Sequence, residues 1–226
     1  RMIKSTAEIE KIAHICIIAS QTFARAGDIF YKGQPLAEAF RAFRIECLTQ
    51  GADDVPYLAG GADQSGYRDI ISPPSKRPLE SGDILMFDTG ATFDGYFCDF
   101  DRNYAIEQAD DISRRAYDTL WRATEAGLTV ARPGITCQDL FQSMQNVISE
   151  MDNQAGEVGR YGHGLGMQLT EWPSHAAFDE TVLEENMVIT LEPSLNYGDG
   201  RIMVHEENLV VQDGAPRLLS VRATPE

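Results

Sequence analysis

The sequence has few cysteines, few basic residues and no long apolar run, and each shortage excludes a class of protein. The four cysteines among 226 residues, Cys16, Cys47, Cys98 and Cys137, include no CxxC pair. We therefore predict buried thiols in a reducing compartment, not a disulfide framework. No apolar run approaches the roughly 18 residues that span a bilayer, and no charged-then-apolar leader precedes the first predicted helix. These absences predict a cytoplasmic location.

Basic residues are outnumbered, with 19 Lys and Arg against 35 Asp and Glu, and the net charge is -16. Such a chain repels nucleic-acid phosphate and anionic lipid, so we predict no nucleic-acid partner and no membrane partner. Part of the acidity can still serve function. Carboxylates gathered around a divalent cation count as charges in the sequence but are neutralised when the ion binds.

Helical and strand patterns are present throughout the chain. Helical spacing of apolar residues predicts a helix over residues 5–27, with a capping box at Ser5 and Glu8, and a second over 35–52. Glycine-rich loops and a polar turn are predicted between residue 52 and the next strand. The later predicted elements are a strand over 84–90, two helices within 110–151 broken at 132–134, and strands within 187–193, 201–211 and 215–221. Helices followed by strands, twice over, predict one α+β domain with two similar halves.

One predicted hairpin is unusually acidic. Residues 88–103 read DTGATFDGYFCDFDRN, and Asp94-Gly95 is typical of the two-residue turn that joins hairpin strands. With that turn, Phe93 pairs with Tyr96, and the register of the whole hairpin follows.

In this register Asp88 lies opposite Asp101, and Asp99 is the diagonal neighbour on the same face. Like charges placed opposite each other destabilise a sheet, so either a cation neutralises them or their pKa values rise sharply. The alternative is that the three aspartates are solvated on an exposed face. A shifted turn or a bulge would change which of them converge.

The second half of the chain offers further ligands for a cation. RYGHGLG places His163 between glycines, TLEP places Glu192 near the end of an apolar strand, and VHEENLVV places Glu206 before another. Each has an ordinary alternative as a structural histidine or a surface glutamate. With Asp88 and Asp99 they supply four carboxylates and one imidazole, and the charge of -4 balances two divalent cations. Oxygen-rich ligation with one nitrogen suits Mn, Co, Fe or Zn.

These segments, in this order and spacing, resemble the creatinase/aminopeptidase family of metallopeptidases, family M24, and within it the Xaa-Pro aminopeptidase and prolidase branch. The similarity rests on DTGATFDGYFCD, GHGLG, TLEP and a glutamate before an apolar strand, and it extends to MIKSTAEIEKI and RPLESGDILMFDTG. It implies the α+β pita-bread fold, in which two pseudo-symmetric halves share a curved antiparallel sheet covered by helices. Residues 1–226 would be a single catalytic domain, and the separate N-terminal domain common in this branch would be absent from this chain.

The resemblance also implies a dinuclear metal centre, with Mn favoured. Asp88 would bind one ion, Asp99 and Glu206 would bridge the two, and His163 and Glu192 would bind the other. A hydroxide between the ions would attack a peptide carbonyl, and Glu192 would be the catalytic residue that takes the proton and passes it on. The implied partners are a short peptide or small-molecule substrate and a second copy of the chain in a homodimer.

Several positions depart from the family pattern. Histidines expected near Ile71 and Ser72 and at Thr170 are missing, an expected arginine is Val204, and a usual threonine is Asp101. Threonine can donate a hydrogen bond but does not titrate near neutral pH. We therefore predict an intact metal site with an altered substrate-binding shell, in which Thr170 and Asp101 contact the substrate.

Two questions stay open at this point. Asp101 either adds a carboxylate that recognises a substrate amine or pairs with Arg102. The altered shell suits either a peptidase of changed specificity or chemistry on a small molecule, as in relatives that hydrolyse creatine or cleave dimethylsulfoniopropionate. A binding module without catalysis is a third alternative, whose mark would be the loss of ligands.

Overall fold

The computed structural model describes residues 1–71, 74–151 and 159–225. The first half contains α1 (Thr6–Ala24), α2 (Ala26–Ile29), α3 (Leu36–Gln50), β1 (Asp54–Gln64), β2 (Asp83–Phe93), β3 (Tyr96–Phe97) and β4 (Phe100–Ala105). The second half contains α4 (Asp111–Val130), α5 (Cys137–Ile148), β5 (His163–Gly164), β6 (Glu171–Ser174), β7 (Val188–Leu191), β8 (Ser194–Asn196), β9 (Ile202–Val204), β10 (Glu207–Val210) and β11 (Arg217–Leu218). Within these ranges no helix combines the length and apolar character needed to cross a membrane.

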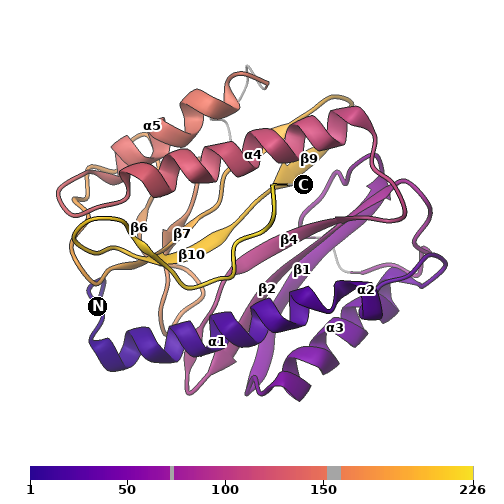
Figure 1. The fold of residues 1–226 in the computed structure, drawn as a ribbon, viewed down its shortest axis with the longest axis horizontal. Coiled ribbons are helices and arrows are strands. Elements are labelled where there is room, and N and C mark those ends of the chain that lie inside the picture. Colours follow the sequence, from indigo (N-terminus) through magenta and orange to yellow (C-terminus); the bar gives the residue numbers. More distant parts are fainter. Residues whose placement is uncertain (72–73, 152–158, 226) are drawn as a thin grey trace.

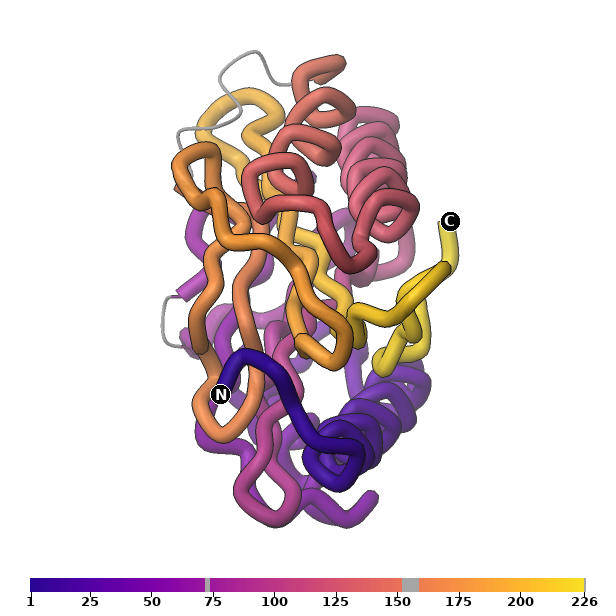
Figure 2. The backbone as a smooth tube through the Cα atoms, turned by 90° about the vertical axis from the view of Figure 1, so that its left-hand side faces the viewer, coloured from indigo at the N-terminus to yellow at the C-terminus, as the bar shows by residue number. Residues whose placement is uncertain are grey.

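Each half packs helices against antiparallel strands, which confirms the predicted α+β class. In the first half β2 pairs with β1, β3 and β4, and in the second the order is β11-β10-β7-β5-β6, with β8 and β9 forming a separate pair. Helices α1 to α3 run along the first sheet, and α4 and α5 run along the second (Figure 1). Figure 2 shows the helices of both halves on the same side of the strands.

The helix boundaries follow the predicted signals. At the start of α1 the Ser5 hydroxyl accepts from the Glu8 backbone N–H, and the Glu8 carboxylate accepts from the Ser5 N–H, so the capping box is confirmed. Helix α3 ends before Gly51, whose φ of 111° is left-handed. Helices α4 and α5 are separated by residues 131–136, which confirms the predicted break.

The acidic hairpin has the predicted register. Phe93 pairs with Tyr96, and the turn residues Asp94 and Gly95 have φ values of 47° and 79°. Positive φ at both central residues is the requirement of a type I′ turn.

Two strand predictions were wrong. Strand β1 occupies a stretch predicted to be glycine-rich loop, because Gly60 lets the two strands approach closely; a Cβ there would lie 2.1 Å from the Met86 carbonyl oxygen. The strand predicted over 201–211 is interrupted between β9 and β10. This interruption places Glu206 outside regular pairing.

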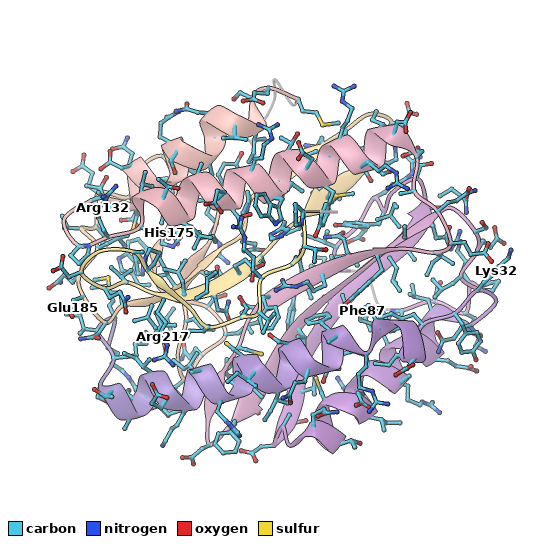
Figure 3. The ribbon with its side chains drawn as sticks, viewed as in Figure 1. Lys32, Phe87, Arg132, His175, Glu185 and Arg217 are labelled. Atoms are coloured by element: carbon cyan, nitrogen blue, oxygen red, sulfur yellow. The ribbon has the colours of Figure 1, made fainter. Side chains whose placement is uncertain are left out.

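A cluster of phenylalanines orients strand β2. Phe87 is fully buried, and its ring centroid lies 4.6 Å from that of Phe30, 4.5 Å from that of Phe40 and 5.2 Å from that of Phe43. Phe40 and Phe43 belong to α3, and Phe30 follows α2. Phe87 is labelled in Figure 3. Because side chains alternate along a strand, Asp88 points to the face of the sheet opposite the helices.

Candidate metal centre

Three aspartates share the face of the first sheet that turns away from the helices. The strand register places Asp88 directly opposite Asp101. Asp99 and Asp101 have exposed fractions of only 4% and 1%. The alternative of solvated aspartates on an exposed face is therefore wrong for these two side chains.

Two neutral side chains form hydrogen bonds with Asp88 and Asp99, and the sequence analysis did not predict either of them. The Tyr57 hydroxyl donates to Asp88 Oδ2 at 2.9 Å. The Asn208 side chain accepts from the Asp99 N–H at 2.9 Å and donates to the Asp99 carbonyl. Tyr57 lies in the stretch predicted as loop, and Asn208 carries no local signal beyond its position two residues after Glu206.

His163 presents a lone pair to the acidic groups. Its Nδ1 lies 2.9 Å from the Gly164 carbonyl oxygen, and since a carbonyl can only accept, Nδ1 is the donor and Nε2 is unprotonated in the neutral ring. Nε2 lies 3.4 Å from Asp99 Oδ2 and 3.9 Å from Glu192 Oε2. A lone pair facing ionised carboxylate oxygens is unfavourable, and either a proton on a carboxyl or a metal ion between them relieves the repulsion.

The predicted ligands come together from both halves of the chain. One ligand atom from each of Asp99, His163 and Glu206 lies within 4.8 Å of the others. Glu192 adjoins this group through its contact with His163. Asp88 lies close enough that its charge raises the pKa of Glu192 and of Glu206.

Burial and mutual repulsion change the protonation of the whole group. Burial raises the pKa of Asp88 to about 6, and burial followed by the charge of Asp88 raises that of Glu192 to about 7. Burial and the charge of Asp88 raise the pKa values of Asp99 and Asp101 well above their usual range. Burial, followed by the charge of Asp99, does the same for the pKa of Glu206. Burial lowers the pKa of His163. In the metal-free protein these carboxyls therefore keep their protons to a higher pH than usual, and a divalent cation would displace those protons.

The donor set fits a divalent metal. Three buried carboxylate oxygens, Asp88 Oδ1, Asp101 Oδ2 and Glu206 Oε1, have no hydrogen-bond partner among the described residues. Buried acceptors without a donor are rare in proteins and point to an ion. Carboxylates with one imidazole are the ligands that Mn, Co, Fe and Zn accept.

Arg102 does not pair with the carboxylate of Asp101, so that sequence alternative is wrong. Its guanidinium donates to Glu207 Oε2 at 2.9 Å and to the backbone carbonyls of Asp101 and Glu206. It also lines a cavity of about 1010 Å³ between α1, β4 and α4. Arg102 thus lies on the helix side of the sheet, and none of the five predicted ligands lines that cavity.

The predicted substrate shell is only partly described. Thr170 is exposed in the segment between β5 and β6, and Ile71 is 73% exposed. Ser72 lies outside the described residues. Leu169 packs over the first sheet, where a Cβ on Gly90 would meet Leu169 Cδ1 at 2.3 Å. The loop that carries Thr170 therefore covers β2 two residues beyond Asp88.

Two charged side chains were not expected from the sequence to take part in the contacts described next. Lys4 Nζ lies 3.0 Å from Glu171 Oε2, and the two side chains are 3% and 15% exposed. This ion pair attaches the N-terminal segment to the strand that follows Thr170. The positive charge of Arg160 lowers the pKa of both Asp99 and Glu192, so a cation adjoins the acidic group.

Comparison with known proteins shows what this chain resembles. The profile of metallopeptidase family M24 matches residues 10–213. The Xaa-Pro dipeptidase of Pyrococcus furiosus is 30% identical over 223 residues, which are 96% of this chain and 63% of that protein. The chain therefore spans about three fifths of the length of such relatives.

Solved structures show the same fold. The X-Pro aminopeptidase of Thermotoga maritima superimposes with a TM-score of 0.90 at 25% identity, covering 99% of this chain and 63% of that one. The dipeptidase PepE of Mycobacterium ulcerans superimposes with a TM-score of 0.91 at 27% identity, covering 99% and 60%. These similarities confirm the predicted pita-bread fold.

Proposed function

This chain belongs to metallopeptidase family M24, and from that premise we propose that it is the catalytic part of a dinuclear-metal hydrolase, an Xaa-Pro aminopeptidase or dipeptidase. One observation carries the proposal: Asp99, His163 and Glu206 bring their ligand atoms within 4.8 Å of one another in a buried site. The printed names of the relatives, Xaa-Pro dipeptidase and X-Pro aminopeptidase, support the substrate class.

We assign the five predicted ligands to two divalent cations, with Mn favoured. Asp88 would hold one ion, Asp99 and Glu206 would bridge both, and His163 and Glu192 would hold the other. The unpartnered Asp88 Oδ1 and Glu206 Oε1 and the unprotonated Nε2 of His163 support this assignment. When bound, the two cations supply Lewis-acid chemistry that activates water and polarises a peptide carbonyl.

Glu192 is the proposed acid-base residue. Its side chain is 25% exposed, so it borders both the ligands and the solvent side of the site. Burial and the charge of Asp88 raise its pKa to about 7 in the metal-free protein. Bound cations would lower that pKa, so the proposed role rests on the position of the carboxylate beside the ligands and the solvent, from which it can accept a proton from water and return it to a leaving amine.

The altered substrate shell supports one second candidate, the same site acting on a small non-peptide molecule. Thr170 can donate a hydrogen bond to a substrate carbonyl but cannot shuttle a proton near neutral pH. If a missing histidine limits peptide cleavage, Thr170→His should raise the kcat for Xaa-Pro substrates. An unchanged kcat would mean that the missing histidine does not limit peptide cleavage.

The test combines metal content with hydrolysis. The protein, loaded with Mn and freed of excess metal, should retain close to two ions per chain by elemental analysis and should hydrolyse Ala-Pro or an Xaa-Pro peptide. Glu206→Ala should lose both properties, whereas Glu185→Gln, at an exposed glutamate, should keep them. Absence of retained metal under any loading would contradict the proposal and favour a binding module.

The homodimer, the cytoplasmic location and the separate N-terminal domain remain predictions. All four cysteines are buried and free, which suits a reducing compartment. Sedimentation analysis of the purified chain tests the dimer directly.

A further inference from the structure

Asp101 occupies a position between two of the proposed ligands. It pairs with Asp88 across the β2–β4 register, and its Oδ1 accepts from the Glu206 backbone N–H at 2.9 Å. The side chain is 1% exposed. Directly opposed side chains in antiparallel strands have Cβ atoms about 5 Å apart, so Asp101 and Asp88 are neighbours on the face that holds the metal centre.

The second carboxylate oxygen of Asp101 has no described partner. Oδ2 is buried and accepts no hydrogen bond. The nearby donors are used elsewhere: the Tyr67 hydroxyl donates to Asn103 Oδ1, and Arg102 donates to Glu207 and to backbone carbonyls. A buried carboxylate oxygen without a donor is costly unless it meets a cation.

The three described residues that carry buried, unpartnered carboxylate oxygens are connected in this way. Those of Asp88 and Glu206 belong to the proposed ligand set, and Asp101 is joined to the first by strand pairing and to the second by a hydrogen bond. We propose that Asp101 is a further carboxylate of the metal-binding set, with Oδ2 directed to the ion site and Oδ1 fixing the backbone of Glu206. This inference rests on the proposed metal centre.

With Asp101 added, the metal centre has more oxygen ligands and more negative charge than the five predicted ligands supply. Five carboxylates and one neutral imidazole carry a charge of -5 against +4 from two divalent cations. Hard oxygen ligands favour Mn²⁺ over softer ions relative to a site with more nitrogen. Asp101 would therefore strengthen Mn²⁺ binding and shift selectivity toward it, a role distinct from contact with a substrate.

Calorimetric titration of the chelator-treated protein with MnCl₂, and separately with ZnCl₂, tests this role without any substrate. Asp101→Asn keeps an oxygen that can accept from the Glu206 N–H but removes the negative charge. We expect its apparent Kd for Mn²⁺ to rise at least about 10-fold, the range seen when groups that support a metal site are removed, with a smaller rise for Zn²⁺. Asp63→Asn makes the same chemical change on β1, four residues beyond Ala59, which is the pairing partner of Asp88. This matched control should bind Mn²⁺ with the wild-type affinity.

The outcomes separate this inference from the proposed function. If the wild type binds no Mn²⁺, the proposed function itself fails. If the wild type binds Mn²⁺ and Asp101→Asn, with wild-type circular dichroism, binds it within about 3-fold, the inference is overturned and Asp101 acts only on Glu206 or on substrate. If the asparagine variant does not fold, Asp101→Thr replaces it in the titration, because threonine also offers the Glu206 N–H an uncharged acceptor. Wild-type Mn²⁺ affinity in the threonine variant would likewise overturn the inference.

Discussion

Removing the metal and raising the pH should destabilise this protein. In the metal-free state burial raises the pKa of Asp88 from 3.8 to about 6 and that of Glu192 from 4.5 to about 7. A carboxyl whose pKa is higher in the folded than in the unfolded state binds more protons when folded. Stability then falls as pH rises through the interval between the two pKa values. The relevant window is pH 4 to 7.

The size of the loss follows from the same two groups. One pKa unit corresponds to about 1.4 kcal/mol, so the rise from 4.5 to about 7 for Glu192 costs about 3 kcal/mol once the group is fully ionised. Asp88 adds a similar amount on its own, but the two charges interact and their costs are not additive. These two groups together therefore cost about 3 to 6 kcal/mol, which is a large part of the 5–15 kcal/mol that stabilises a typical domain.

Urea unfolding in a chelating buffer at pH 5, 6, 7 and 8 measures this effect. The free energy of unfolding should fall mainly between pH 5 and 7 and less between pH 7 and 8, and Glu192→Gln should reduce the fall by about half. Saturating Mn²⁺ should cancel most of it, since an ion at 1,000 times its Kd adds about 4 kcal/mol. Glu185→Gln is the control with no expected change in slope. A free energy that is flat or rises between pH 5 and 8 without metal would refute the reasoning.

Three further substitutions test single contacts. Tyr57→Phe removes the donor to Asp88 Oδ2, and its Mn²⁺ affinity by calorimetry should fall about 10-fold; an unchanged affinity would mean that Tyr57 does not orient Asp88. Lys4→Met leaves Glu171 without its cation in a largely buried site and should cost about 3 kcal/mol in urea unfolding. The double variant with Glu171→Gln should recover most of that loss, and no recovery would contradict a direct pairing. Phe87→Ala should cost about 3 to 5 kcal/mol, while its metal content per folded chain stays at the wild-type value; loss of metal would show that the phenylalanine cluster also orients the centre.

Much of the candidate site could be predicted because the geometry of the acidic hairpin, residues 88–103, depends on local rules. A two-residue Asp94-Gly95 turn and the alternation of side chains along a strand are enough to place Asp88 opposite Asp101. The helix boundaries at Ser5 and Gly51 likewise follow from capping chemistry. These features involve residues close in sequence, so a pattern in the chain carries them.

The errors arose where long-range packing overrides local preference. Gly60 weakens the strand propensity of β1, and the strand forms through its pairing with β2, whose Met86 backbone leaves no room for a Cβ at Gly60. The choice of Glu207 over Asp101 as the partner of Arg102 depends on how β4 packs beside β10. Tyr57 and Asn208 were missed because their importance comes from contacts with residues 31 and 109 positions away.

The sequence by itself determined the fold class, the hairpin register and the identity of the carboxylates that share one face. Tertiary structure alone decided that those carboxylates are buried and that His163 and Glu206 meet Asp99, more than a hundred positions from Glu206 along the chain. The physical reason is that pleat and turn geometry act between neighbouring residues, whereas desolvation depends on how the two halves pack. Desolvation in turn raises the pKa of each carboxyl and favours binding of a cation to its oxygens.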